Sequence, residues 1–189
     1  MAKIINANNL TKIYGEKETS VTALDDINIE FRENEFTAIM GPSGSGKSTL
    51  LHCLAGLDRP TSGKIFLKGN DIATLNDKEL TKIRRDSFGF IFQAFNLIPT
   101  LTAEENITLP ASIAGRKPDM DWVKEVVETV DIADRLSHRP NELSGGQQQR
   151  VAAARAMATK PEVIFADEPS GNLDSKSSRE LLTFMKSVV

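Results

Sequence analysis

The sequence predicts an α/β protein in which an N-terminal, largely antiparallel β subdomain leads into a mostly parallel sheet, with an α-helical subdomain inserted between strands. Short β-favouring runs separated by turn residues fill residues 2–40. From about 93 to 160 the apolar residues recur at helical spacing. A continuous apolar run then follows at 163–166, with the length typical of a buried parallel strand.

The first half of the chain alternates strands with two helices. The run Phe36–Met40 predicts a buried strand that ends at a glycine-rich turn. A helix is expected next, with Leu50, Leu51 and Leu54 on one face and Gly56 as its stop. Beyond it, we expect a strand pair over 63–72, a charged helix that begins after Asn76, and a strand over 88–92.

Two helices are predicted within the inserted subdomain. The first has an apolar face made of Trp122, Val123, Val126, Val127 and Val130. The second is expected to begin at Ser144 and to end near Ala158, ahead of Pro161.

The amino-acid composition argues against several classes of protein. The chain has 189 residues, 23 Lys and Arg against 26 Asp and Glu, and a formal net charge of −3, which argues against a nucleic-acid-binding surface. Its single cysteine, Cys53, cannot form an internal disulfide and fits a reducing compartment. No apolar stretch reaches the 18 or so residues of a membrane span, and the first ten residues do not resemble a secretory signal. We therefore expect a soluble cytoplasmic domain.

A glycine-rich segment between a predicted strand and a predicted helix matches G-x-x-x-x-G-K-[ST]. It reads Gly41-Pro42-Ser43-Gly44-Ser45-Gly46-Lys47-Ser48, and Thr49 follows as a further nucleotide-binding candidate. Glycines allow backbone N–H groups to surround phosphate oxygens, and a helix N-terminus adds partial positive charge. We expect Lys47 to reach the β- and γ-phosphates and Ser48 to ligate Mg²⁺. The segment predicts a P-loop NTPase core; the alternative is an ordinary glycine-rich turn.

Two adjacent carboxylates follow the apolar run 163–166. In an extended strand end, neighbouring side chains point to opposite sides, so Asp167 and Glu168 are expected to have different roles. We assign Asp167 to the metal and Glu168 to the general base that activates water. The alternative for this acidic pair is a solvent-exposed helix cap.

The segment Leu143-Ser144-Gly145-Gly146-Gln147 precedes the second helix of the inserted subdomain. Ser144 and Gln147 fit a capping box. That interpretation leaves Gly145 and Gly146 unexplained, because each glycine in a helical turn costs about 1 kcal/mol relative to alanine. The two glycines indicate that a ligand approaches this backbone closely, at a second anion site.

With these motifs in place, the sequence resembles the ATP-binding cassette (ABC) ATPases. The LSGGQ at 143–147 resembles their signature, Tyr14 their adenine-stacking aromatic residue, Gln93 their Q-loop glutamine, and residues 171–174 their D-loop. The resemblance implies that Gln93 contacts Mg²⁺ and signals to a transmembrane partner. It also implies a head-to-tail dimer, in which Ser144, Gly145, Gly146 and Gln147 of one copy face the ATP held by the other. For Tyr14, packing against the sheet remains the alternative.

The resemblance also implies how the chain is divided. One ABC ATPase domain is expected over 1–189, with a nucleotide-binding core and β subdomain at about 1–92 and 161–189 and a helical signature subdomain at about 93–160. Family members carry a switch histidine several tens of residues after the D-loop, and this chain has none there. We therefore expect a C-terminally truncated cassette that binds ATP and hydrolyses it poorly.

Within the family, three segments, residues 99–110, 141–158 and 165–175, resemble those of the lipoprotein-release, macrolide-export and antimicrobial-peptide-resistance group. The resemblance implies an ATPase subunit on the cytoplasmic face of the membrane that powers a transmembrane permease. Phe95, Leu97, Ile98 and Leu101 form either a groove for a coupling helix of that partner or ordinary subdomain packing. The first alternative function is a regulatory ATPase that controls a membrane-anchored enzyme; a second is a soluble ABC protein acting on DNA or ribosomes.

Overall fold

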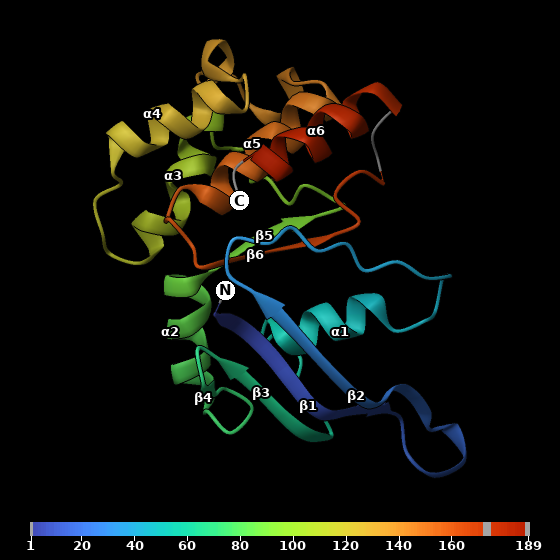
Figure 1. The fold of residues 1–189 in the computed structure, drawn as a ribbon. Coiled ribbons are helices and arrows are strands. Elements are labelled where there is room, and N and C mark those ends of the chain that lie inside the picture. Colours follow the sequence, from blue (N-terminus) through green and yellow to red (C-terminus); the bar gives the residue numbers. More distant parts are fainter. Residues whose placement is uncertain (1, 172–174, 188–189) are drawn as a thin grey trace. The chain divides into compact units, whose positions relative to one another are not determined.

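The computed structural model describes residues 2–171 and 175–187, and the chain divides into two compact units, residues 1–84 and residues 85–188 (Figure 1). The predicted α/β class is confirmed, because an antiparallel sheet, a parallel strand pair and several helices are all present.

The first unit contains a four-stranded antiparallel sheet with the strand order β2-β1-β3-β4. Its elements are β1 (Lys3–Tyr14), β2 (Val21–Arg32), α1 (Lys47–Leu54), β3 (Ser62–Leu67), β4 (Asn70–Asp71) and α2 (Asp77–Ser87), the last three residues of which belong to the second unit. Helix α1 packs against β1 and β2 (Figure 1). The buried side chains of this unit include Ile5, Leu10, Leu24, Leu54 and Ile65.

Helices α1 and α2 begin and end as their sequences predict. Leu50 and Leu54 are buried and Leu51 is half-buried, and Gly56 follows α1 with a φ of 61°. The side chain of Asn76 accepts a hydrogen bond from the Glu79 N–H, and the Glu79 carboxylate accepts one from the Asn76 N–H. This reciprocal pair starts α2.

The predicted strand at Phe36–Met40 is wrong. The structure shows no regular secondary structure over these residues, and the side chain of Met40 is 89% exposed. A strand exists only where a neighbouring strand supplies backbone partners along its length, and a short apolar run does not specify that neighbour.

Among its described residues, the second unit contains a parallel strand pair and four complete α-helices. They are β5 (Phe88–Phe92), α3 (Ala103–Ile113), α4 (Met120–Thr129), α5 (Gly145–Met157), β6 (Val163–Asp167) and α6 (Ser175–Ser187). Of the five residues in β6, only Phe165 is fully buried, so the expectation of a wholly buried strand is not met.

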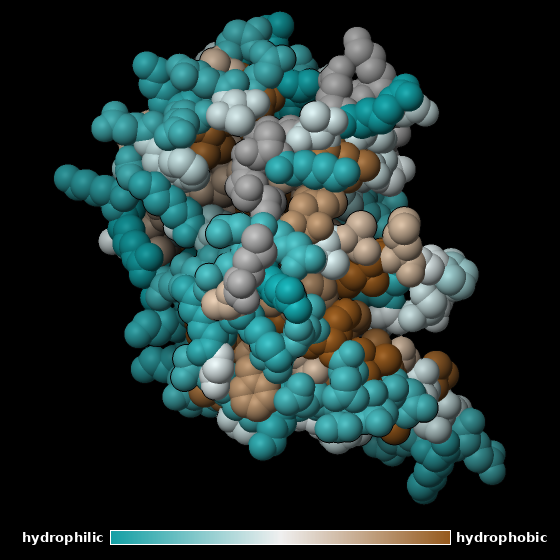
Figure 2. Space-filling view, viewed as in Figure 1, coloured by the Kyte–Doolittle hydropathy of each residue, from teal (hydrophilic) through white to brown (hydrophobic). Residues whose placement is uncertain are grey.

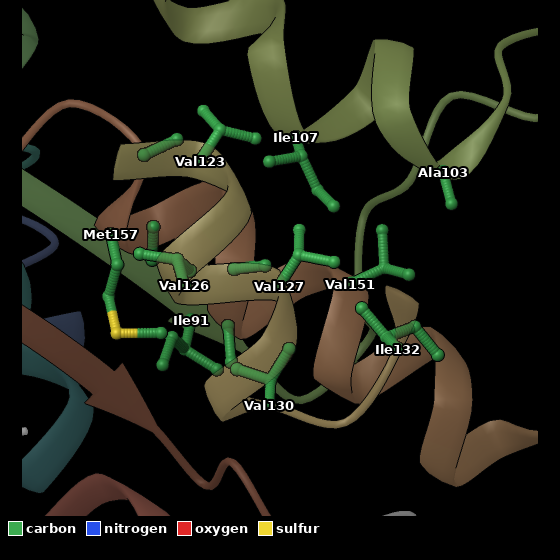
Figure 3. Packing of buried hydrophobic residues seen from close by; sticks show 14 of the residues in the cluster. Ile91, Ala103, Ile107, Val123, Val126, Val127, Val130, Ile132, Val151 and Met157 are labelled. Carbon is green, nitrogen blue, oxygen red and sulfur yellow. The ribbon is translucent and has the colours of Figure 1, made fainter. Parts of the chain in front are cut away.

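Helix α5 lies at the centre of this unit's core (Figure 3). Its buried face is made mostly of small residues, which allows α3, α4 and β5 to pack close to its backbone. On β5, Gly89 lies so near the carbonyl oxygen of Ala156 that a side chain there would overlap it. The predicted apolar face of α4 is confirmed, with Val123, Val126 and Val127 buried in this cluster.

Asn106, which is fully buried on α3, holds the loop that leads from β5 to α3. Its Oδ1 accepts a hydrogen bond from the Ile98 N–H at 2.8 Å. Its Nδ2 lies 3.2, 3.2 and 2.9 Å from the carbonyl oxygens of Ile98, Leu101 and Thr102. One side chain therefore provides partners for several backbone polar groups of this turn.

Hydrophilic side chains cover much of the face seen in Figure 2, and hydrophobic ones gather in a limited region. Over the described ranges, none of the helices combines the length and the apolar character that crossing a bilayer requires.

Replacing Asn106 by leucine should lower the free energy of unfolding by about 2–4 kcal/mol, because the Ile98 N–H and nearby carbonyl groups lose their partners inside the core. Urea unfolding followed by circular dichroism measures this. The control Ser112→Ala, on an exposed position of the same helix, should change stability by less than about 0.5 kcal/mol. Equal stability of Asn106→Leu and the wild type would contradict this role.

Stability should also fall above neutral pH because of Cys53. Burial raises the pKa of its thiol to about 11, against ~8.5 in an unfolded chain. Between these values the unfolded state releases a proton that the folded state keeps, so about 2–3 kcal/mol of stability is lost as the pH rises. The difference between wild type and Cys53→Ala, from urea unfolding at pH 8 and pH 11, isolates this contribution. An equal loss of unfolding free energy in the wild type and in Cys53→Ala would contradict this prediction.

Candidate functional site

The predicted phosphate loop lies in the first unit, directly before α1. Gly46 is the N-cap of α1 with a φ of 87°, and a side chain there would overlap the carbonyl oxygen of Ala23 on β2. Both facts require glycine at this position. The Lys47 ammonium donates hydrogen bonds to the carbonyl oxygens of Gly41 at 3.0 Å and Pro42 at 2.8 Å, so its side chain folds back along the loop.

The start of α1 has the properties of an anion site. Its N-cap residue is Gly46, which has no side chain to cap the helix, and its first turn contains no acidic residue. By contrast, α2, α3 and α4 each carry an acidic side chain in the first turn. Residues 41–45 are exposed, so an anion can reach these N–H groups and the Lys47 ammonium.

Tyr14 lies at the end of β1 in the same unit and is 42% exposed. Its side chain makes hydrogen bonds with Asp58 and with the hydroxyl of Thr49, in the first turn of α1. The structure thus places Tyr14 beside the helix that follows the phosphate loop, as a nucleotide-binding role requires.

The other candidate groups lie in the second unit, at the carboxyl ends of β5 and β6. These strands are parallel, and Phe92 is the register partner of Asp167. Gln93 therefore leaves β5 beside the point where Asp167 and Glu168 leave β6. Gln93 also lies against the backbone of Gly171, since a Cβ built on Gly171 would be 2.6 Å from the amide nitrogen of Gln93.

The residues that carry the two carboxylates differ in backbone conformation. Asp167 is the last residue of β6, whereas Glu168 has a left-handed backbone with a φ of 45°. This conformation costs about 1 kcal/mol or more for a residue other than glycine, and such strain concentrates at functional sites. The Gly171 N–H donates to the Glu168 carbonyl at 3.0 Å and holds the turn. The expectation of an extended backbone at Glu168 is therefore wrong.

The predicted capping box at the start of α5 is confirmed. The Gln147 N–H donates to the Ser144 hydroxyl oxygen at 3.3 Å, and the Ser144 N–H donates to the Gln147 side chain at 2.8 Å. The Ser144 hydroxyl keeps its own proton to donate. A side chain at Gly145 would meet only the Phe95 ring, at an ordinary 3.9 Å, so internal packing does not demand glycine there. This supports the close approach of a ligand.

Two contacts that the sequence analysis missed tie α5 to the carboxylate edge. The buried Gln149 donates from Nε2 to the carbonyl oxygen of Pro169 at 2.7 Å, directly after Glu168. Arg155 donates to the carbonyl oxygens of Phe95 at 2.7 Å and Asn96 at 2.6 Å, two and three residues after Gln93. A polar residue on the buried face of α5 is the only sequence signal for Gln149.

Each unit offers oxygen donors of the kind that Mg²⁺ prefers. Asp167 and Gln93 offer carboxylate and amide oxygens in the second unit, and Ser48 offers a hydroxyl oxygen in the first. Mg²⁺ in nucleotide sites takes few protein ligands besides phosphates and water. Residues 2–171 and 175–187 contain no group of three or more His, Cys, Asp or Glu side chains arranged for a metal. Of the predicted D-loop, Gly171 is described and residues 172–174 lie outside the described residues.

The chain is similar to proteins of known type over nearly its whole length. The family model described as ABC transporter matches residues 24–171. A lipoprotein-releasing system ATP-binding protein, LolD, from Geobacter metallireducens is 47% identical over 96% of this chain and 81% of its own length. A macrolide export ATP-binding/permease protein, MacB, from Marinobacter nauticus is 46% identical over 96% of this chain, which spans 29% of that protein.

Solved structures are also similar to this chain. The dimeric structure of MJ0796, an ABC transporter cassette, is 45% identical and superposes with a TM-score of 0.87, covering 97% of this chain and 82% of that one. A second structure of the same cassette is a post-hydrolysis state bound to ADP and Pi, again with a TM-score of 0.87. The chain carries the phosphate loop, the carboxylate edge and, at the start of α5, the signature segment; we call α5 the signature helix. The chain belongs to the ABC transporter family and is an ATP-binding cassette ATPase.

Proposed function

We propose that this ATPase powers a membrane transport complex, of the exporter or mechanotransmission type, through closure and opening of a head-to-tail dimer of two copies. Each copy would hold one ATP with Tyr14, the phosphate loop and Thr49. The signature residues Ser144, Gly145, Gly146 and Gln147 of the other copy would cover that ATP.

The observation that carries the proposal is the grouping of Gln93, Asp167 and Glu168 at one strand edge. Phosphoryl transfer needs a group that orients or deprotonates the attacking water, next to a group that holds the metal. Glu168 is exposed and directed by its left-handed turn, so it suits the water. Asp167, at the strand end, suits the metal together with the amide oxygen of Gln93.

The phosphate loop would balance the negative charge of the ATP phosphates. The Lys47 ammonium would exchange the loop carbonyl groups for the β- and γ-phosphate oxygens, and the N–H groups at the start of α1 would complete the phosphate site. A bound Mg²⁺, held by Ser48, Gln93 and Asp167, would neutralise charge that develops on the phosphate oxygens.

The start of α5 supports the dimer. Its first turn contains no acidic residue, Ser144 is exposed, and Gly145 leaves the backbone uncovered. These are the properties of a second anion site. In a dimer, one copy would supply the start of α1 and the other copy the start of α5 to the same γ-phosphate. A site completed by a second copy therefore accounts for both anion sites. The similar cassette MJ0796 forms a dimer in its solved structure.

The relatives support a membrane permease as partner. MacB is named as an ATP-binding and permease protein, and LolD as the ATP-binding protein of a lipoprotein-releasing system. In this chain Leu97 packs against the core of the second unit, whereas Ile98 is 39% exposed. The exposed part of this segment, next to Gln93, would receive the partner and hold the ATPase at the cytoplasmic face of the membrane.

Replacing Glu168 by glutamine should lower the rate of ATP hydrolysis by a hundredfold or more, because the amide cannot take the proton of the attacking water. ATP binding should persist, and the protein should accumulate as an ATP-bound dimer. Phosphate release and gel filtration with Mg·ATP measure the two effects.

The matched control is Glu162→Gln, which removes an exposed carboxylate five residues before Asp167. It should hydrolyse ATP like the wild type. Hydrolysis by Glu168→Gln at the wild-type rate would overturn the assignment of the base.

A further inference from the structure

Tyr14 is held in place by a salt bridge that none of the nucleotide-binding motifs includes. Its hydroxyl donates to one carboxylate oxygen of Asp58 at 2.7 Å, and the other oxygen accepts from the Lys12 ammonium at 2.7 Å. The same ammonium lies 4.7 Å from the centroid of the Tyr14 ring. Ring, carboxylate and ammonium thus form a closed triangle.

This triangle joins β1 to α1, which lie side by side in Figure 1. Lys12 and Tyr14 are two residues apart on β1, so both side chains project from the same face of the strand. Asp58 follows α1, where its N–H donates to the carbonyl oxygen of His52 at 3.1 Å. Lys12 also donates to the carbonyl oxygen of Arg59 at 2.8 Å. The orientation of Tyr14 is therefore fixed relative to α1 and its phosphate loop.

The salt bridge is well protected. The side chains of Lys12 and Asp58 are only 13% and 30% exposed, whereas Tyr14 is 42% exposed. The hydrogen bond to Asp58 is the main cause that raises the pKa of Tyr14, so the phenol remains a donor through the neutral range. An exposed tyrosine at a strand end would otherwise rotate about its side-chain torsions. Here its hydroxyl and one face already have partners.

We propose that Lys12 and Asp58 are positioning residues for the base of the bound nucleotide, acting through Tyr14. The Lys12 ammonium covers one face of the ring, and Asp58 fixes its rotation, so the remaining face is presented to the base. This inference rests on the proposed contact between Tyr14 and adenine. A side chain ordered before binding loses less conformational entropy on binding, and that difference corresponds to about a two- to tenfold gain in affinity.

The test compares two ligands that share the phosphates and differ in the base. Isothermal titration calorimetry with Mg·ATP and with Mg·tripolyphosphate is carried out on wild type, Asp58→Ala, Lys12→Met and Tyr14→Ala. Asp58→Ala and Lys12→Met should each weaken ATP binding about two- to tenfold and change tripolyphosphate binding by less than twofold. The control Lys3→Met removes another ion-paired lysine of β1 and should change neither.

A double variant shows whether the salt bridge acts through the ring. Adding Asp58→Ala to Tyr14→Ala should cause no further loss of ATP affinity, because the residue that Asp58 positions is already gone. Additive losses would overturn the inference, as would equal weakening of ATP and tripolyphosphate, since both results would indicate a general effect on the fold.

The outcomes separate the two proposals. If Tyr14→Ala weakens ATP binding and the variants at Lys12 and Asp58 do not, the inference is wrong and the adenine contact stands. If Tyr14→Ala leaves ATP affinity unchanged, the adenine contact itself is wrong, and the positioning role is lost with it.

Discussion

The parallel register of β5 with β6 is the constraint on which the catalytic half of the site depends. It sets Phe92 opposite Asp167, so that Gln93 and Glu168 leave adjacent strand ends together. Aromatic packing supports this register: the Phe165 ring lies 5.1 Å from that of Phe88 and 5.8 Å from that of Phe90. A slip by one residue would turn Asp167 to the opposite face of the sheet and separate the metal ligand from the glutamine.

In α1 and in α5, the residues that would contact ATP are different from the residues that stabilise the fold. The phosphate loop and the start of α5 are exposed, whereas Leu50 and Leu54 of α1 and the alanine-rich face of α5 are buried. Each helix therefore anchors its own N-terminus through a packed face, while the exposed residues that precede the helix remain accessible to anions. Gln149 and Arg155 extend this arrangement, because they connect α5 to the segments that follow Glu168 and Gln93.

The sequence predicted features that depend on local patterns. The caps of α2 and α5, the end of α1 at Gly56 and the buried face of α4 each follow from residues within a few positions of one another. The residues Phe36–Met40 were misassigned because strand pairing depends on distant partners. Lys12, Asp58 and Gln149 were missed for the same reason: Asp58 is 46 residues from Lys12, and Pro169 is 20 residues from Gln149. The left-handed position of the turn at Glu168 is not occupied by a glycine that would reveal it.

The central claim, that each ATP is held by the phosphate loop of one copy and covered by the signature helix of another, is tested most directly by mixing two defective variants. In a Glu168→Gln background, Lys47→Ala and Gly146→Asp should each fail to retain radiolabelled ATP through gel filtration. Mixed together, they should retain ATP, because a heterodimer contains one intact site assembled from both chains. A mixture that retains no more ATP than the separate variants would contradict the account.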